Sequence, residues 1–178
     1  MIALTILAHR GTRLHFLTAM FLLCTVLVSP ALADPPAAFQ DLLRGLIHQV
    51  AATNDYKLMR PLIGADDATV SGLVKLLRDP QLPGHERFVT AVAFSYVRTP
   101  AALAALLANS SDAEPLVRQG VSLSLGYFRD ETGAVRAALT PLAATDPSTY
   151  TDAKTGETRY LVRETAQGAL TRLAQAQP

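Results

Sequence analysis

The chain has 178 residues, and its 16 Lys and Arg against 15 Asp and Glu give a formal charge of +1. So balanced a charge provides no electrostatic footprint for nucleic acid or for an anionic membrane surface. A single cysteine, Cys24, excludes an intrachain disulfide and a cysteine-cluster metal site.

The first 33 residues have the pattern of a secretory signal peptide. Arg10 and Arg13 precede an apolar run at residues 14–28, which Pro30 ends. The small residues at both ends of 31–33 are typical of a signal-peptidase site. We therefore expect cleavage near the end of this triplet and a periplasmic or secreted protein.

Two alternatives for this segment are a retained membrane anchor and a lipoprotein. The apolar run is shorter than the ~20 residues that a spanning helix needs, and residues 21–23 lack the small side chain expected before a lipidated Cys24. Cleavage after Ala33 leaves 145 of the 178 residues, with 14 basic and 15 acidic side chains and no cysteine. We expect one domain with no membrane insertion after cleavage and no thiol chemistry.

Residues 34–65 are predicted to form an N-terminal helical cap. An amphipathic helix is indicated by apolar residues at i, i+3, i+4, i+7 spacing, which are Phe39, Leu42, Leu43, Leu46, Ile47 and Val50. Pro61 then discourages a continuous helix. A short helix or turn is expected there, and it would bury Leu58, Met59, Leu62 and Ile63.

The remainder, 66–178, is organised around residues 112–129. In this segment Arg118 heads a helix-spaced apolar column formed by Val121, Leu125 and Phe128. Arg87 heads a similar column of Thr90, Phe94 and Val97, and Arg163 heads one of Ala166, Leu170 and Leu173. The three arginines lie 31 and 45 residues apart, so one unit recurs with an excess of 14 residues before its last copy. Self-similarity at such a period indicates a solenoid.

Another predicted helix precedes each arginine helix, at residues 68–77, 100–107 and 132–144. Their apolar stripes are Val70, Leu73, Leu76 and Leu77; Leu103, Leu106 and Leu107; and Val135, Leu139 and Leu142. An aspartate follows each stripe, namely Asp79, Asp112 and Asp146. Neither helix of a pair can bury its stripe alone, so neighbouring pairs must stack.

From residue 66 to about 174 this pattern resembles HEAT repeats, especially the short HEAT-like kind named for phycobilin lyases. In that family an aspartate after the first helix and an arginine near the start of the second recur in register, and a small residue follows a late leucine, as in Leu125-Gly126. The copy at Arg87 departs from the others, because Glu86 stands where they have valine. The resemblance implies an all-α solenoid of about three helix pairs, joined by charge-assisted Asp–Arg hydrogen bonds. Regular spacing without a partner histidine disfavours the alternative, in which these residues form a catalytic or anion site.

The excess before the last copy, at residues 145–160, is predicted to be a short β-hairpin or an ordered loop. Triplets rich in β-forming residues, 149–151 and 158–160, flank a polar turn that ends in Gly156, which can take a positive φ. Insertions in repeats often lie on the binding face, although a tolerated surface insertion costs little. Its candidate partner-binding residues are Tyr150, Lys154, Arg159 and Tyr160.

A second candidate surface lies on the arginine helices. One column there reads Tyr96, Tyr127 and Arg172, and the next reads Arg98, Arg129 and Ala174. Tyrosine and arginine dominate binding energy at protein interfaces, so Tyr96, Arg98, Tyr127 and Arg129 are also candidate partner-binding residues. The alternative is that the tyrosines pack between helices and the arginines only compensate helix dipoles.

Catalysis finds little support in the sequence. The only histidines after the signal segment, His48 and His85, have no i, i+4 partner, and no glycine-rich phosphate loop or nucleophile elbow is present. We expect no enzyme, no cofactor and no metal, and a noncatalytic protein–protein interaction module (scaffold or adaptor) of the bacterial periplasm whose partner is another protein. The alternatives are an immunity-type inhibitor of an envelope toxin and a lyase-like chaperone, because fold alone does not fix function.

Overall fold

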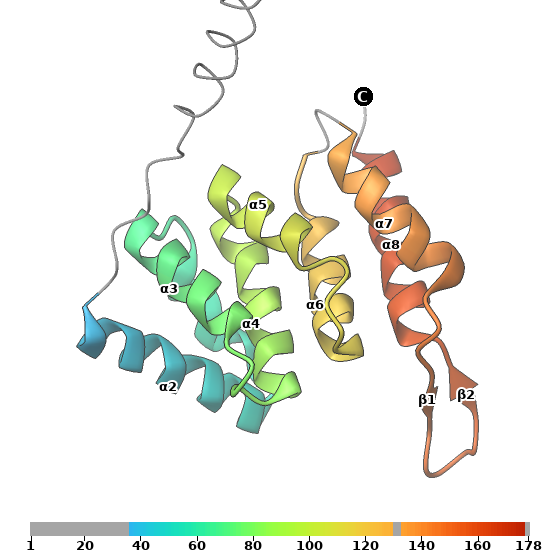
Figure 1. Ribbon diagram of the computed structural model, residues 1–178, viewed down its shortest axis with the longest axis horizontal. Coiled ribbons are helices and arrows are strands. Elements are labelled where there is room, and N and C mark those ends of the chain that lie inside the picture. Colours follow the sequence, from blue (N-terminus) through green and yellow to red (C-terminus); the bar gives the residue numbers. More distant parts are fainter. Residues whose placement is uncertain (1–35, 130–132, 177–178) are drawn as a thin grey trace, which may run out of the picture. The chain divides into compact units, whose positions relative to one another are not determined.

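The computed structural model describes residues 36–129 and 133–176, which belong to one compact unit (Figure 1). The predicted signal segment lies outside the described residues. Within these ranges the regular structure is helical apart from one two-stranded sheet, and the all-α prediction is confirmed to that extent.

The elements follow the predicted order closely. They are α2 (Ala37–Thr53), the 3-10 helix η1 (Tyr56–Leu62), α3 (Asp67–Arg78), α4 (Gly84–Val97), α5 (Pro100–Ala108), α6 (Pro115–Leu125), α7 (Ala134–Thr145), β1 (Tyr150–Thr151), β2 (Thr158–Arg159) and α8 (Leu161–Gln175). The helices α3, α5 and α7 correspond to the predicted first helices, and α4, α6 and α8 are the arginine helices.

The arginine helices pack side by side, α4 against α6 and α6 against α8, while α5 contacts both α3 and α7 (Figure 1). Their predicted columns are buried except at Leu170, which is half-buried because Ala169 takes the inward position on α8. On α5 the stripe also differs from the prediction. Leu106 is buried together with Ala102 and Ala105, whereas Leu103 and Leu107 are half-buried.

The N-terminal helices bury a narrower stripe than expected. Leu43, Ile47 and Val50 are buried on the side of α2 that faces α3 and α4, but Leu42 is 71% exposed on its outer side. The predicted burial of Ile63 is also wrong, since this residue follows the end of η1 in an extended conformation and is 62% exposed.

Small residues allow the arginine helices to approach one another closely. A Cβ added at Gly120 of α6 would lie 2.8 Å from the carbonyl oxygen of Phe88 and 3.0 Å from the Cβ of Ala91 on α4. One added at Gly126 would lie 2.8 Å from Nη2 of Arg172 and 2.9 Å from the Cβ of Ala169 on α8. The small residue after Leu125 is therefore explained by the contact between α6 and α8.

Guanidinium groups join each helix pair to the next. Arg87 on α4 binds both carboxylate oxygens of Asp112, which follows α5, and its Nε donates to the carbonyl of Leu77 at 2.9 Å. Arg118 on α6 repeats the arrangement: Nε and Nη2 donate to Asp146 at 2.7 and 3.1 Å, while Nη1 donates to the carbonyl of Asp112 at 2.7 Å. The predicted Asp–Arg hydrogen bonds between successive pairs are confirmed.

Two further arginines extend this series of guanidinium contacts, one at each end. At the N-terminal end Arg44 of α2 binds Asp79 at 3.0 Å, a pair that the sequence alignment did not include. At the other end Nε of Arg163 on α8 donates to the backbone carbonyl of Asp146 at 2.6 Å. Arg44 is 53% exposed whereas Arg118 is 12% exposed, so the N-terminal ion pair is the more solvated of the two.

We predict that Gly120→Ala lowers the free energy of unfolding by about 1–3 kcal/mol, because the new methyl group overlaps the backbone of α4. Gly45→Ala is the matched control, since a Cβ there meets nothing within 4 Å. In an exposed helix interior this change should stabilise by about 0.5–1 kcal/mol. Urea unfolding measures both, and equal effects of the two substitutions would contradict the packing described.

Asp146→Asn is predicted to cost about 3 kcal/mol at neutral pH, since it leaves the mostly buried Arg118 without its carboxylate. Burial opposes ionisation of Asp146, but hydrogen bonds from Arg118 and Ser148 outweigh it and lower its pKa. A lowered pKa means that the ion pair contributes fully above the ordinary value and is lost as pH falls below it. The difference from wild type should therefore shrink below about pH 4.

The matched control for that experiment is Asp79→Asn. Both aspartates accept a backbone N–H two residues onward, but the Arg44 pair is exposed, so its loss should cost less than about 1 kcal/mol. Urea unfolding from pH 7 to pH 2.5 would compare the two. A pH-independent deficit for Asp146→Asn would show that ionisation of this group does not stabilise the fold.

Candidate functional site

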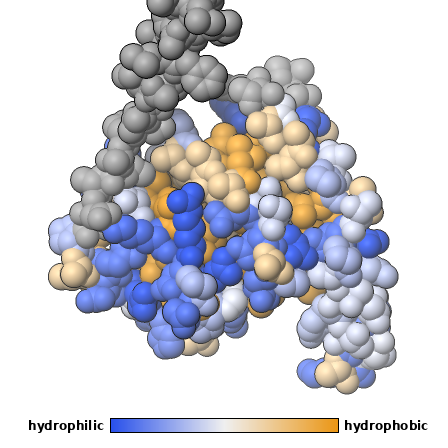
Figure 2. Space-filling view, in the orientation of Figure 1, coloured by the Kyte–Doolittle hydropathy of each residue, from blue (hydrophilic) through white to orange (hydrophobic). Residues whose placement is uncertain are grey.

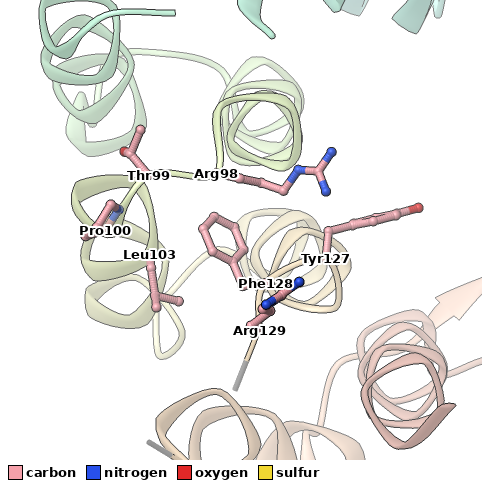
Figure 3. A pocket seen from close by; sticks show the side chains of 7 residues that line it. All are labelled: Arg98, Thr99, Pro100, Leu103, Tyr127, Phe128 and Arg129. Carbon is pink, nitrogen blue, oxygen red and sulfur yellow. The ribbon is translucent and has the colours of Figure 1, made fainter. Parts of the chain in front are cut away.

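A hollow of about 650 Å³ opens where α4 ends, α5 begins and α6 ends (Figure 3). We call it the arginine cleft. Its lining residues are Arg98, Thr99, Pro100, Leu103, Tyr127, Phe128 and Arg129. Three of the eight predicted partner-binding residues, Arg98, Tyr127 and Arg129, therefore line one cavity.

A tight corner between α4 and α5 forms one wall of the cleft. Arg98 ends α4 in the left-handed region, with φ of 46°, where glycine or asparagine is usual. This conformation costs an L-residue about 1–2 kcal/mol. Thr99 then caps α5, its hydroxyl accepting a hydrogen bond from the N–H of Ala102 at 3.1 Å, and Pro100 occupies the first helical turn.

The end of α6 forms the other wall. Its last turns tighten, with the N–H of Tyr127 donating to the carbonyl of Ser124 at 3.0 Å and that of Phe128 to Leu125 at 3.1 Å. As a result Phe128 is 7% exposed, whereas Tyr127 is 48% exposed. Figure 3 shows Arg98 and Tyr127 extending to the same side of the cleft.

The cleft is cationic and aromatic. Arg98 and Arg129 are exposed, and Arg172 of α8 stacks over the ring of Tyr127 at 5.0 Å from its centroid. The Nη2 of Arg172 donates to the carbonyl of Leu123 at 3.5 Å. Its Nε is buried with no hydrogen-bond partner among the described residues. Tyr127 is thus held in place from the α8 side while its outer edge remains open.

The structure places Tyr96 outside this cavity. Its hydroxyl donates to the carbonyl of Tyr56 in η1 at 3.4 Å, and its side chain is half-buried. Burial raises the pKa of Tyr56, and the nearby Tyr96 adds to that rise. Tyr96 therefore anchors the N-terminal helices, as the packing alternative for these tyrosines expects.

The insertion folds as the predicted hairpin. The strands β1 and β2 are antiparallel, with Tyr150 opposite Arg159, and Gly156 takes a φ of 70° in the turn. Asp152 organises this turn by accepting the N–H of Lys154 at 2.7 Å and that of Thr155 at 3.0 Å. These hydrogen bonds, the one from Thr155 first, lower the pKa of Asp152.

Two of the predicted binding residues of the insertion, Arg159 and Tyr160, already make side-chain contacts with α8. Arg159 forms an ion pair with Glu164 of α8, and this hydrogen bond raises the pKa of Arg159. Arg163 stacks over the ring of Tyr160 at 4.2 Å from its centroid. Tyr150 and Lys154 are exposed, Tyr150 to 51%.

The cleft and the hairpin lie at opposite ends of α6. The cleft is at its C-terminal end, whereas Asp146 and Ser148, near the start of the insertion, accept hydrogen bonds from Arg118 in the first turns of the helix. Eleven helical residues rise by about 16 Å. The eight predicted residues therefore do not form a single surface.

On the face shown in Figure 2, the hairpin and the surface over α5 also differ in hydropathy. Side chains of intermediate hydropathy cover the hairpin at the lower right, while apolar side chains gather toward the upper centre, over α5. Leu103 of α5 lines the cleft.

The part of the chain that the structure describes contains neither a cluster of metal-ligating side chains nor a membrane-spanning helix. No group of three or more His, Cys, Asp or Glu side chains there is arranged to hold a metal ion. Among the same residues no helix combines the length and apolarity that crossing a membrane requires. Comparison with protein-family models, with curated proteins and with solved structures finds no match.

Proposed function

We propose that the protein is a noncatalytic protein-interaction module, a HEAT-like solenoid of the bacterial periplasm, that binds a partner protein in the arginine cleft. The observation that carries the proposal is that equivalent positions of two successive units meet in one cavity. Arg98 and Arg129 are 31 residues apart, the interval that also separates Arg87 from Arg118.

The solenoid part of the proposal is supported by the repeated contacts between units. Packing of α4 on α6 recurs as packing of α6 on α8, and the Arg87–Asp112 ion pair recurs as Arg118–Asp146. Repeats of this kind expose one edge of every unit in register, so a binding surface can extend over neighbouring units.

The cleft has the chemistry and rigidity of a protein-binding site. Tyrosine and arginine are the residues most enriched among energetic hot spots. Thr99 caps the helix that follows Arg98, and Arg172 stacks on Tyr127, so both walls of the cleft are ordered before a partner binds. Binding therefore has to order few side chains. The positive φ of Arg98 adds support, because such strain is concentrated at functional sites.

The cleft is tested with two tyrosine variants that serve as each other's control. Tyr127→Ala and Tyr150→Ala remove side chains of nearly equal exposure, 48% and 51%, one at the cleft and the other on the hairpin. Both are used as crosslinking baits beside wild type in the envelope fraction of cells that carry the protein. A captured protein is identified by mass spectrometry, and its binding is repeated with purified components.

We expect a partner that wild type and Tyr150→Ala bind and that Tyr127→Ala binds at least about tenfold more weakly, a loss of about 1.4 kcal/mol. Loss with Tyr150→Ala alone would move the site to the hairpin and contradict the proposal. A further bait with residues 150–158 replaced by a Gly-Ser link checks this, and it retains Ser148 because that residue bonds Arg118 and Asp146. The identity of the partner would separate an adaptor from a toxin inhibitor.

A further inference from the structure

Resting on the proposed function, we infer that the arginine cleft recognises its partner through carboxylates, and that it takes an acidic segment in which two carboxylates flank an apolar side chain. The inference starts from the two exposed guanidinium groups at the mouth of the cleft. Neither Arg98 nor Arg129 has a side-chain hydrogen bond or ion pair with a described residue, and both are exposed.

Two other arginines of the chain show how its guanidinium groups bind carboxylates. Arg87 and Arg118 each hold an aspartate through two guanidinium nitrogens. A guanidinium presents a planar fork that matches a carboxylate in this bidentate manner. Among the described residues these donors of Arg98 and Arg129 have no partner, and the two side chains line one cavity, which suits two carboxylates of one ligand.

The lining between the arginines is apolar. Pro100 and Leu103 lie on the α5 side, and Phe128 lies on the α6 side (Figure 3). The hydroxyl of Thr99 is already used to cap α5. An apolar side chain between two acidic ones would therefore meet matching surface, while a purely charged ligand would leave this lining exposed to water.

A protein segment fits these features better than a polyphosphate or nucleic acid. Carboxylate side chains of a protein segment can pair with Arg98 and Arg129, and an apolar side chain of the same segment can pack on the lining. The chain as a whole carries a formal charge of only +1, too little for the basic footprint that nucleic-acid binding requires.

The probes are three capped peptides, Ac-Gly-Glu-Leu-Glu-Gly-NH2, its Gln-Leu-Gln counterpart and its Glu-Gly-Glu counterpart. They are titrated by 1H–15N NMR into the protein recovered after expression of the complete sequence. The test variant is Arg98→Gln with Arg129→Gln. The matched control is Arg60→Gln with Arg78→Gln, which removes the same charge at two exposed positions outside the cleft.

We expect the Glu-Leu-Glu peptide to shift amides of residues 98–103 and 127–129, and to bind at least about tenfold more tightly than the Gln-Leu-Gln peptide. The test variant should lose about as much affinity, the control variant should bind as wild type does, and salt at about 0.5 M should weaken binding. The Glu-Gly-Glu peptide should bind more weakly than Glu-Leu-Glu because it lacks the apolar contact.

Equal binding of the Glu and Gln peptides would overturn the inference, as would shifts confined to the hairpin or no shifts with any peptide. Equal binding of Glu-Leu-Glu and Glu-Gly-Glu would overturn its apolar part. None of these results decides the proposed function, which depends on capture by the tyrosine variants. Loss of the partner with Tyr127→Ala together with equal Glu and Gln binding would keep the cleft as a binding site and reject carboxylate recognition.

Discussion

The contact on which the rest of the structure depends is a guanidinium that bonds two helix pairs at once. Arg118 donates to the carbonyl of Asp112, which precedes its own helix, and to the carboxylate of Asp146, which follows the next one. Because its donors lie in one plane, the guanidinium holds these acceptors in a set orientation relative to one another. Arg87 imposes the same constraint one unit earlier.

This constraint acts at one end of α6, and close packing acts along the rest of the helix. Gly120 lets the backbone of α6 approach that of α4, and Gly126 lets α8 reach the end of α6. Arg172 is wedged at that second contact and stacks on Tyr127, so the packing that closes the helix end also orients an exposed tyrosine. The arginine cleft is thus a consequence of how the units are joined.

The sequence predicted the features that repeat. Buried columns follow from helical periodicity, and the Asp–Arg hydrogen bonds were implied by the resemblance to HEAT repeats, so both could be expected without a structure. Periodicity does not tell which side of a terminal helix has a neighbour, and for this reason Leu42 was predicted to be buried although it lies on the outer side of α2. For the same reason the sequence did not predict the ion pair between Arg44 and Asp79, because the helix of Arg44 lies outside the repeated segments.

The candidate site was predictable only in part, for a related reason. Tyr96 and Tyr127 occupy equivalent positions of two units, but η1 covers the first and no equivalent element covers the second within the described residues. Likewise, Arg159 was predicted to bind a partner, but in the structure it forms an ion pair with Glu164. The cleft itself depends on the left-handed turn at Arg98, which residue type does not suggest.

Guanidinium–carboxylate pairs couple successive helix pairs, and a double-mutant cycle on Arg87 and Asp112 measures that coupling. These side chains are 14% and 13% exposed, so each single change to alanine should be destabilising by more than a surface ion pair would allow. We expect an interaction energy of about 1–3 kcal/mol between the two changes in urea unfolding. Strict additivity, within about 0.3 kcal/mol, would show that the two side chains do not act on each other and would contradict this coupling.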